Sequence, residues 1–435
     1  MPTKIVVVGA GSLQFGLGTC GSIFNSSILE GSSITLHDIN AENLEYARAA
    51  CQAKLDQDNL NFSLESTLNR KEALKGANFV VSAIEVGPRF YWWEIDKKIP
   101  WKYGSTQVFG ENGGPGGMFH ALRIVPQVLD ICEDINHICP NAVFINYSNP
   151  MSRICLSIKR KYPNLKTIGL CHEIAFAEHH LPKILKIPFE NMELWSGGLN
   201  HFGSVIEANN RETNEDLLPQ IREKGVTYLK RWQRIFPFSS AVKLTTYILK
   251  YFGYMPYTTD SHYGEYIGWA RDVVNKIGIK RFYTFYKLFT GLIGKRIRHK
   301  IRNDKGNQLV KPDHERAIPI IEGILSDDNH HELSVNLPNK GIISNLPEDL
   351  VVECPATVNK SGVHGNVLGV YPEPLVNILK IESTVQDLVV NAIIHKSRDF
   401  AVQALQADPN FPRKHFINEF LDEMVEIQKE WISLE

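Results

Sequence analysis

The segment KIVVVGAGSLQFG, residues 4–16, decides the fold of the first half of the chain. Its apolar run leads directly into glycines at positions 9, 11 and 16. Such a run predicts a buried strand, and the glycines predict a tight turn into a helix whose N-terminus faces a phosphate group. We expect Gly9 to make the turn and Gly11 to let the backbone approach a pyrophosphate.

A carboxylate follows where a dinucleotide site requires one. The segment SSITLHDIN, residues 32–40, predicts a second strand that ends in Asp38. This carboxylate would accept the ribose hydroxyls and repel a 2′-phosphate, so NAD is favoured over NADP. The third glycine arrives later than in G-x-G-x-x-G, so the prediction depends on the glycines and Asp38 together. The expected cofactor-binding residues are Gly9, Gly11, Ser12, Asp38, Asn40 and Ala83.

Strand-like and helical segments alternate after this point. Residues 77–87, 141–150 and 166–173 read as strands, and residues 118–135 read as a helix. This alternation predicts an α/β fold with a Rossmann-type parallel sheet, whose ligands lie beyond the carboxyl ends of the strands. A chain of 435 residues is too long for one ordinary core. We predict an NAD-binding domain over residues 1–190 and a C-terminal α+β domain, residues 191–435, for substrate binding and oligomerisation.

The composition excludes several classes of protein. The formal net charge is −1, so no global field attracts nucleic acid or an anionic membrane. No apolar run of the length of a membrane span interrupts the sequence. The N-terminus leads straight into the first strand without the layout of a signal peptide. Seven scattered cysteines without a C-x-x-C suit a reducing compartment, so we predict a cytoplasmic protein.

A thiol and an imidazole end two of these segments. TIGLCHEI, residues 167–174, places Cys171 at the end of a predicted strand, and SGGLNHFGSVI, residues 196–206, holds His201 between glycines. Sulfur and imidazole nitrogen both bind divalent transition ions, and two protein ligands leave positions open for a substrate. The alternative is a packed thiol with an unrelated histidine.

Taken in order, several motifs resemble those of glycoside hydrolase family 4, a family of NAD- and manganese-dependent glycosidases related to lactate and malate dehydrogenases. The motifs are GAGS, LHDIN, GPGGMFHALRIVP, NYSNPM, GLCHE and GLNHFG. The C-terminal half is similar as well, through ERAIPIIEGIL, residues 333–365 and ALQADPNFP. The resemblance covers most of the chain and is weakest in the segment that follows residue 210 and ends near residue 310.

The resemblance implies cleavage by transient oxidation, outside the usual scheme of two carboxylates. Hydride passes from C3 of the sugar to NAD, and the resulting ketone makes the C2 hydrogen acidic. A divalent metal on the C2 and C3 oxygens stabilises the enediolate that forms. The C1–oxygen bond then breaks by elimination, water adds, and the hydride returns. NAD is therefore required but not consumed.

The resemblance also assigns residues. It implies that Cys171 and His201 are the metal ligands and that Asn149 contacts the C2 and C3 oxygens. Glu111 stands where a carboxylate protonates the leaving group, and His172 bonds the substrate or steers that acid. The expected alternatives are an ordinary Asn-Pro turn for Asn149 and a solvated loop carboxylate for Glu111.

The base that takes the C2 proton is expected in PYTTDSHYGEY, residues 256–266. We predict Asp260 as the base and Tyr266 as the second candidate, because relatives place an Asp or a Tyr in this region. His262 is expected to bind the substrate. Metal and ketone together lower the demand on the base, so a group of ordinary pKa suffices.

The expected substrate is an unphosphorylated α-hexoside. His172 follows the metal cysteine as in the branch of the family that acts on α-galactosides, α-glucosides and hexuronides. Arg89 lies among aromatic residues in the segment 86–104, where it can clamp the carboxylate or sulfonate of an acidic sugar. A surface ion pair is the alternative for Arg89. His120 replaces a residue that is commonly Arg in relatives.

Other functions remain open at this stage. A hydroxy-acid dehydrogenase of the same superfamily would use His201 as its acid–base group and would accumulate NADH. An inactive sugar or NAD sensor would have no need for Cys171, His201, Asn149 and Glu111 together. Residues 280–305 contain nine Lys or Arg with interleaved aromatics, and we expect a helix over a core or a subunit interface rather than on a membrane. A homodimer or homotetramer is predicted.

Overall fold

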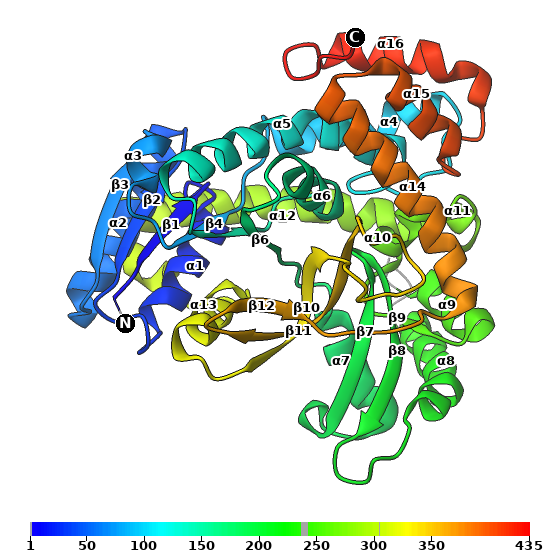
Figure 1. Ribbon diagram of the computed structural model, residues 1–435, viewed down its shortest axis with the longest axis horizontal. Coiled ribbons are helices and arrows are strands. Elements are labelled where there is room, and N and C mark those ends of the chain that lie inside the picture. The colour runs from blue at the N-terminus through cyan, green and yellow to red at the C-terminus, as the bar shows by residue number, and fades with distance from the viewer. Residues whose placement is uncertain (1, 236–241, 304) are drawn as a thin grey trace.

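The structure is a computed structural model that describes residues 2–235, 242–303 and 305–435. One sheet runs through the whole molecule (Figure 1), in the strand order β3-β2-β1-β4-β5-β6-β10-β11-β7-β8-β9, with β12 beside β11. Its parallel half consists of β1 (Lys4–Val8), β2 (Ser33–His37), β3 (Ser63–Thr67), β4 (Phe79–Ser82), β5 (Val143–Asn146) and β6 (Lys166–Gly169). Its antiparallel half consists of β7 (Met192–Leu199), β8 (Phe202–Asn210), β9 (Met255–Pro256), β10 (His330–Pro338), β11 (Val351–Asn359) and β12 (Gly362–Gly365).

Helices cover both faces of this sheet and both ends of the molecule (Figure 1). In the first half they are α1 (Leu13–Phe24), α2 (Ala41–Asp58), α3 (Arg70–Leu74), α4 (Arg89–Lys102), α5 (Gly114–Ile138), α6 (Met151–Lys161) and α7 (Ala175–Leu185). In the middle segment they are α8 (Leu218–Ile235), α9 (Lys243–Phe252), α10 (Asp260–Tyr263), α11 (Ala270–Val273) and α12 (Lys276–Arg302). The last are α13 (Ala317–Ser326), α14 (Glu373–His395), α15 (Arg398–Ala407) and α16 (Ile417–Ile427).

The α/β class with a Rossmann-type parallel sheet is confirmed. Every strand expected from an apolar run in the first half is present. These strands pair in parallel, so their carboxyl ends lie along one edge of the sheet. Strand β3 was not expected. Its sequence SLEST is polar, and as an edge strand it is half-exposed, so no apolar pattern marks it.

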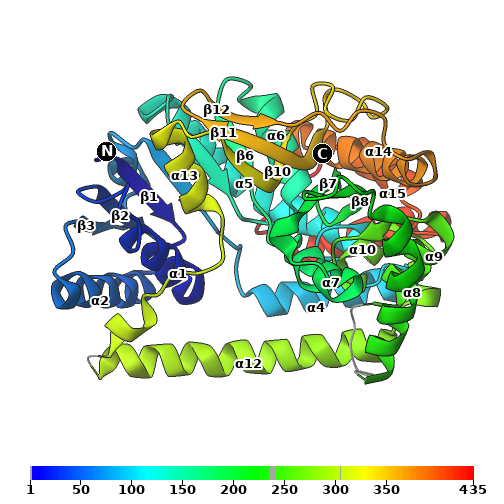
Figure 2. The same cartoon turned by 90° about the horizontal axis from the view of Figure 1, so that it is seen from below.

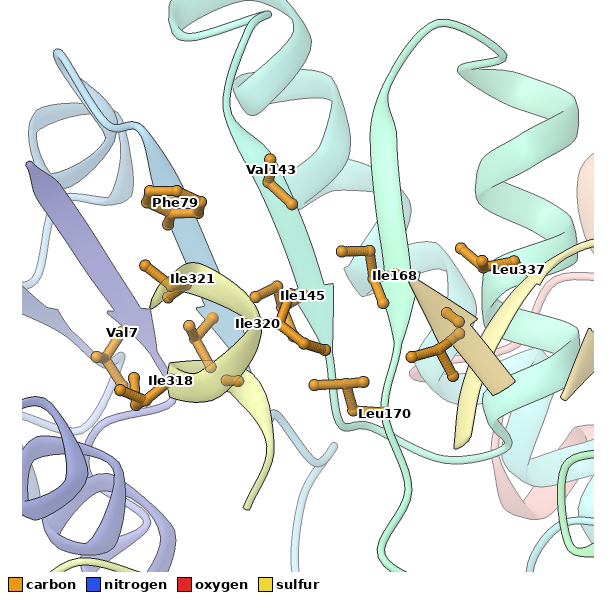
Figure 3. Packing of buried hydrophobic residues seen from close by; sticks show 14 of the residues in the cluster. Val7, Phe79, Val143, Ile145, Ile168, Leu170, Ile318, Ile320, Ile321 and Leu337 are labelled. Carbon is orange, nitrogen blue, oxygen red and sulfur yellow. The ribbon is translucent and has the colours of Figure 1, made fainter. Parts of the chain in front are cut away.

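The two halves share the sheet and the core. Strand β10 pairs with β6 through Asn336 opposite Gly169. Helix α13 of the second half packs on the face formed by β1, β4 and β5 of the first half (Figure 3). Its residues Ile318, Ile320 and Ile321 are buried there. The expected boundary at residue 190 therefore does not interrupt the hydrophobic core.

Helix α12 contains the basic aromatic segment, apart from residues 303–305, of which residue 304 lies outside the described residues. It runs along one side of the molecule (Figure 2). Its inner face contributes Tyr283, whose ring stacks on Phe109 with centroids 3.6 Å apart. Its outer face leaves large apolar side chains exposed, among them Phe285 and Leu288. Among the described residues, no helix is both long and apolar enough to cross a membrane.

Candidate active site

A single cavity of about 1990 Å³ collects nearly all of the predicted site residues. It opens at the carboxyl ends of the parallel strands, as the fold requires. All six predicted cofactor-binding residues line it, and so do Cys171, His201, Glu111, His172, Asn149, Arg89 and His262. Asp260 and Tyr266 are not among its lining residues.

The turn after β1 and the end of β2 form one unit. Gly9 has a φ of +85°, and its N–H donates to the carbonyl oxygen of His37 at 2.9 Å. A Cβ at Gly9 would lie 2.5 Å from the carbonyl oxygen of Ala83, so only glycine fits. The N–H of Gly11 donates to Asp38 Oδ2 at 2.8 Å. This close backbone packing provides the cradle and the carboxylate that a dinucleotide requires.

Cys171 and His201 come together from different parts of the chain. Cys171 follows β6, and His201 occupies the two-residue turn between β7 and β8 with a φ of +61°. Cys171 Sγ lies 3.1 Å from His201 Nε2. Two such atoms on one tetrahedral ion stand about 3.5 Å apart, so small shifts suffice to bind a metal between them.

The electrostatics of the pair suit a cation. Burial lowers the pKa of His201 to about 3, so the imidazole is neutral and keeps a lone pair for a metal. Burial also raises the pKa of the Cys171 thiol well above its usual range, and the carboxylates of Glu353 and Glu173 raise it further. A divalent ion would offset these negative charges and stabilise the thiolate. In the described part of the chain, no set of three or more His, Cys, Asp or Glu is placed to hold an ion.

Behind this pair lies a buried polar cluster that the sequence did not indicate. Asn200, next to His201, donates through Nδ2 to Glu353 Oε2 at 2.5 Å. Asn336 Nδ2 donates to the same oxygen at 3.1 Å. Glu353 is buried in β11, far along the chain from His201, so no local motif connects the two. These contacts orient the turn that carries the imidazole.

His262 lies beside the pair, as does Glu173. The rings of His262 and His201 have centroids 4.4 Å apart, and His262 Nε2 is 3.8 Å from Glu173 Oε1. Burial opposes ionisation of Glu173, but His262, His201 and the Thr258 hydroxyl outweigh it and lower the pKa of Glu173 to about 2. Glu173 is the last residue of the GLCHE motif and was not predicted as functional. His262 Nδ1 is buried and has no hydrogen-bond partner among the residues described.

Glu111 and Arg89 form an ion pair at the cavity wall. Arg89 Nη2 lies 3.3 Å from Glu111 Oε1, and Arg89 Nε lies 3.9 Å from Glu85 Oε2. The guanidinium also stacks over the ring of Trp93 at 4.1 Å. His120, which stands in place of an Arg, contacts Glu85 at 3.4 Å. Arg89 was expected to clamp an acidic sugar, but two carboxylates of the chain already offset its charge.

Asn149 and His172 lie at the ends of β5 and β6. Asn149 Oδ1 is buried without a hydrogen-bond partner in the described parts of the chain, so it is available to a ligand. His172 is largely exposed, and its Nδ1 lies 3.7 Å from Glu315 Oε1. Both side chains line the cavity beside Cys171.

Neither candidate for the base is among the residues that line the cavity. The carboxylate of Asp260 accepts the N–H groups of Leu244 at 2.9 Å and Thr245 at 3.0 Å, at the first residues of α9. The Tyr266 hydroxyl donates to the carbonyl oxygen of Asn200 at 3.2 Å. Its oxygens are engaged at the N-terminus of α9, so the role of Asp260 as the C2 base stays a prediction that this geometry does not favour. Tyr266 is likewise engaged with the backbone.

The fold and the cavity define an enzyme of the Rossmann type whose nucleotide cradle opens onto a thiol–imidazole pair. The chain belongs to glycosyl hydrolase family 4. The family 4 glycosyl hydrolase model matches residues 4–187, and the model of the family's C-terminal domain matches residues 196–411. The protein is therefore a glycoside hydrolase, which sets aside the dehydrogenase alternative.

Relatives agree with this assignment. The alpha-glucosidase of Erwinia rhapontici is 41% identical over 100% of this chain and 99% of its own length. The alpha-galactosidase of Bacillus subtilis strain 168 is 27% identical over 94% of this chain and 93% of its own length. A 6-phospho-alpha-glucosidase from gut microorganisms, solved with NAD and Mn2+, superimposes with a TM-score of 0.84 over 100% of both chains at 20% identity. The malate dehydrogenase of Plasmodium falciparum shares the fold with a TM-score of 0.53 at 14% identity, over 90% of this chain and 99% of that one.

Proposed function

We propose that this protein is an NAD- and Mn-dependent glycosidase that hydrolyses unphosphorylated α-hexosides, α-glucosides first among them. One observation carries the proposal. The dinucleotide cradle at Gly9, Gly11 and Asp38 lines the same cavity as a thiol and an imidazole 3.1 Å apart. The 41% identity to an alpha-glucosidase supports the sugar, and a related structure that holds both NAD and Mn2+ supports the cofactors.

The charge of the cavity favours a neutral sugar. Nine Asp or Glu side chains line it, against three Arg, and its described lining includes no Lys. Each of these arginines is already paired with a carboxylate other than the proton donor: Arg89 with Glu85, Arg316 with Glu332 and Arg70 with Asp134. A sugar phosphate would therefore enter a cavity whose described lining has an excess of carboxylates, no Lys and no unpaired Arg. This argument also disfavours uronides and sulfosugars relative to neutral hexosides.

The chain's own residues bind and orient the sugar. When bound, the dinucleotide takes up and returns a hydride at C3 while the divalent ion polarises the C2 and C3 oxygens. Cys171 and His201 would hold that ion, and the free Oδ1 of Asn149 accepts a sugar hydroxyl beside it. His172 reaches the open side of the cavity, where it contacts the outer part of the substrate.

Proton transfer needs an acid and a base on the cavity wall. Glu111 is the buried carboxyl group that delivers a proton to the departing oxygen. For the C2 proton we keep the two candidates from the sequence and favour Tyr266, whose hydroxyl donates to the carbonyl oxygen of Asn200, the residue before His201. Substitution Tyr266→Phe should then abolish exchange of the C2 hydrogen with solvent.

A panel of aryl glycosides tests the proposal. Neutral α-glucosides and α-galactosides, their β anomers, uronides and 6-phosphoglycosides are incubated with NAD and Mn2+, with and without chelator. We expect cleavage of a neutral α-hexoside, loss of activity after chelation, no net NADH, and incorporation of solvent deuterium at C2. Preferred cleavage of a 6-phosphoglycoside would overturn the substrate assignment, and cleavage after complete metal removal would overturn the mechanism.

A cytoplasmic location and assembly as a homodimer or homotetramer are part of the same proposal. All seven cysteines are free thiols in the structure, as a reducing compartment requires. Two domains, residues 1–190 and 191–435, remain our description of the chain's organisation, with the second half completing the cavity through His201 and His262.

A further inference from the structure

Glu85 is a carboxylate of the cavity wall to which the proposed mechanism gives no role. The residue before it, Ile84, uses both its N–H and its carbonyl oxygen to bind the Ser148 hydroxyl, at 2.9 and 2.8 Å. Since Asn149 follows Ser148, the side chains of Glu85 and Asn149 start from neighbouring parts of the backbone, and both line the cavity. We therefore expect a sugar held by Asn149 to lie within reach of Glu85.

The two oxygens of this carboxylate have different surroundings. Oε1 accepts the N–H of Val86 at 2.9 Å and lies 3.4 Å from His120 Nε2. Oε2 lies 3.9 Å from Arg89 Nε, which is beyond hydrogen-bond distance. Burial opposes ionisation of Glu85, but His120, Arg89 and the Val86 N–H outweigh it and lower the pKa of the carboxyl group. An ionised carboxylate is thus fixed through Oε1 and keeps Oε2 for a hydroxyl group of a ligand.

Two side chains connect Glu85 to the loop that carries Glu111. His120 Nδ1 lies 2.8 Å from the carbonyl oxygen of Glu111, so this nitrogen carries a hydrogen and Nε2 faces Glu85. Arg89 lies between the two carboxylates, with Nη2 3.3 Å from Glu111 Oε1. A guanidinium at a cavity wall is a good site for an anionic group of a substrate. Glu85 therefore competes with any such group for Arg89.

We propose that Glu85 determines the specificity of the site for neutral sugars: Oε2 accepts a hydroxyl group of the hexose, and the negative charge keeps Arg89 from binding a phosphate or carboxylate. The inference rests on the proposed function and assigns to one residue a preference that the overall charge of the cavity only favours. A hydroxyl group gains a charge-assisted hydrogen bond at this position, whereas an anionic group meets repulsion at short range.

The substitution Glu85→Gln removes the charge and keeps the size of the side chain. We expect kcat/KM to fall about 10-fold for the neutral aryl α-hexoside that the wild type cleaves best, because a charge-assisted hydrogen bond becomes a neutral one. Competitive inhibition by the corresponding free hexose should become about 10-fold weaker. Inhibition by its 6-phosphate should become about 10-fold tighter, because the repulsion is removed and Arg89 is released.

A second substitution, Arg89→Met, in the Glu85→Gln protein tests the part assigned to the guanidinium. The gain for the hexose 6-phosphate should disappear, because the released cation is what binds the phosphate. The weaker inhibition by the free hexose should remain. Comparing the two inhibitors cancels any loss of activity that Arg89→Met causes through Glu111. A gain that persists without Arg89 would contradict the role of this arginine.

Glu322→Gln is the matched control, because it removes the same charge from the same cavity. Glu322 lies on α13, where it accepts the hydroxyl group of Ser26. Its substitution should leave both inhibition constants unchanged. If Glu85→Gln does not fold, Glu85→Ser carries the same prediction.

The outcomes separate this inference from the proposed function. If Glu85→Gln and Glu322→Gln change the two inhibition constants alike, net charge and not Glu85 sets the specificity, and the inference is overturned while the wild type still cleaves neutral glycosides. A wild type that cleaves a 6-phosphoglycoside in preference to a neutral one would overturn the proposed function instead.

Discussion

Cys171 differs from the other six cysteines because it alone lines the cavity, whereas they are buried in the core. The substitution Cys171→Ser keeps the size of the side chain but replaces a soft sulfur ligand with a weak hydroxyl ligand. We expect Mn2+ affinity to fall at least about 100-fold and hydrolysis to fall with it, since metal ligands and their supports carry effects of this size. The free-ion resonance signal during a Mn2+ titration measures the change.

Cys139→Ser is the control for this experiment, because Cys139 is a buried thiol at the end of α5 outside the cavity. It should leave Mn2+ affinity unchanged. A Cys171→Ser protein that binds Mn2+ as tightly as the wild type would remove the thiol from the metal site.

Asp260 gives a prediction about stability and pH. Burial raises the pKa of Asp260 from 3.8 to about 6, although N–H groups of Leu244 and Thr245 lower it. The folded state thus keeps the proton to higher pH than the unfolded chain does. The wild type should therefore lose up to about 3 kcal/mol of unfolding free energy as pH rises from about 4 to about 6. The side chain introduced by Asp260→Asn does not titrate. The difference in unfolding free energy between the wild type and this variant should therefore become smaller as pH rises over this interval.

Urea unfolding of both proteins at about pH 4.5 and about pH 7 measures this change. A deficit that widens with rising pH would contradict the assigned direction. Hydrolysis by folded Asp260→Asn should stay within about 3-fold of the wild type, because the carboxylate acts as a helix cap. A loss of activity without a loss of stability would restore Asp260 as the base.

The site residues that could be predicted are those marked by local sequence. Gly9, Gly11 and Asp38 belong to one β–turn–α–β unit, and Cys171 follows β6, a separate strand that an apolar run also marks. The partners of Asp260 could not be predicted, because the residues whose N–H groups donate to its carboxylate lie in the segment where motifs are weakest. Glu265 and Glu353 are single acids without a local pattern, and only tertiary contacts with residues 110–113 and 200 reveal their positions.

The turn between β1 and α1 is the element that the nucleotide depends on most. Gly9→Ala introduces a Cβ 2.5 Å from the Ala83 carbonyl oxygen and at a φ of +85°. The turn must open, which displaces the N–H groups that face the pyrophosphate. We expect NAD affinity to fall more than about 10-fold, measured by quenching of tryptophan fluorescence or by calorimetry. Gly76→Ala is the control, because Gly76 has a similar φ of +71° but a Cβ placed there would have no atom within 4 Å. It should leave NAD affinity unchanged.

Helix α12 shows where a sequence pattern stops being informative. Its basic and aromatic residues predicted a helix, and the helix is present over Lys276–Arg302. Its aromatics are not equivalent, because Tyr283 and Tyr286 line the cavity while Phe285 and Leu288 face outward. The sequence cannot distinguish these faces, since both are apolar and the partner of the inner face, Phe109, is distant in the chain. Only the fold shows that this helix is a wall of the active site.

At the scale of the whole molecule, the two predicted domains share one sheet and one hydrophobic core. The sheet continues from β6 into β10, and α13 covers the strands that would otherwise belong to an independent Rossmann domain (Figure 3). Ile318, Ile320 and Ile321 of the second half are buried in one hydrophobic cluster with residues of the first half. We therefore expect folding of the first half to depend on the second, because burial of this face supplies part of its stability.

Separate expression of residues 1–190 and 191–435 tests this dependence. Without α13 and β10, the first fragment exposes Val7, Phe79 and Ile145 on one face of its sheet, and a contiguous apolar patch of that kind promotes aggregation. We expect each fragment alone to be insoluble or to lack a cooperative thermal transition, and their coexpression to restore a complex that binds NAD. A fragment 1–190 that folds alone and binds NAD like the full chain would show instead that the shared core is not required. Ile320→Ala in the full chain gives a quantitative test. We expect it to lower the free energy of unfolding by about 2–4 kcal/mol, because it leaves a cavity between the two halves. Fluorescence and circular dichroism should report the same single unfolding transition.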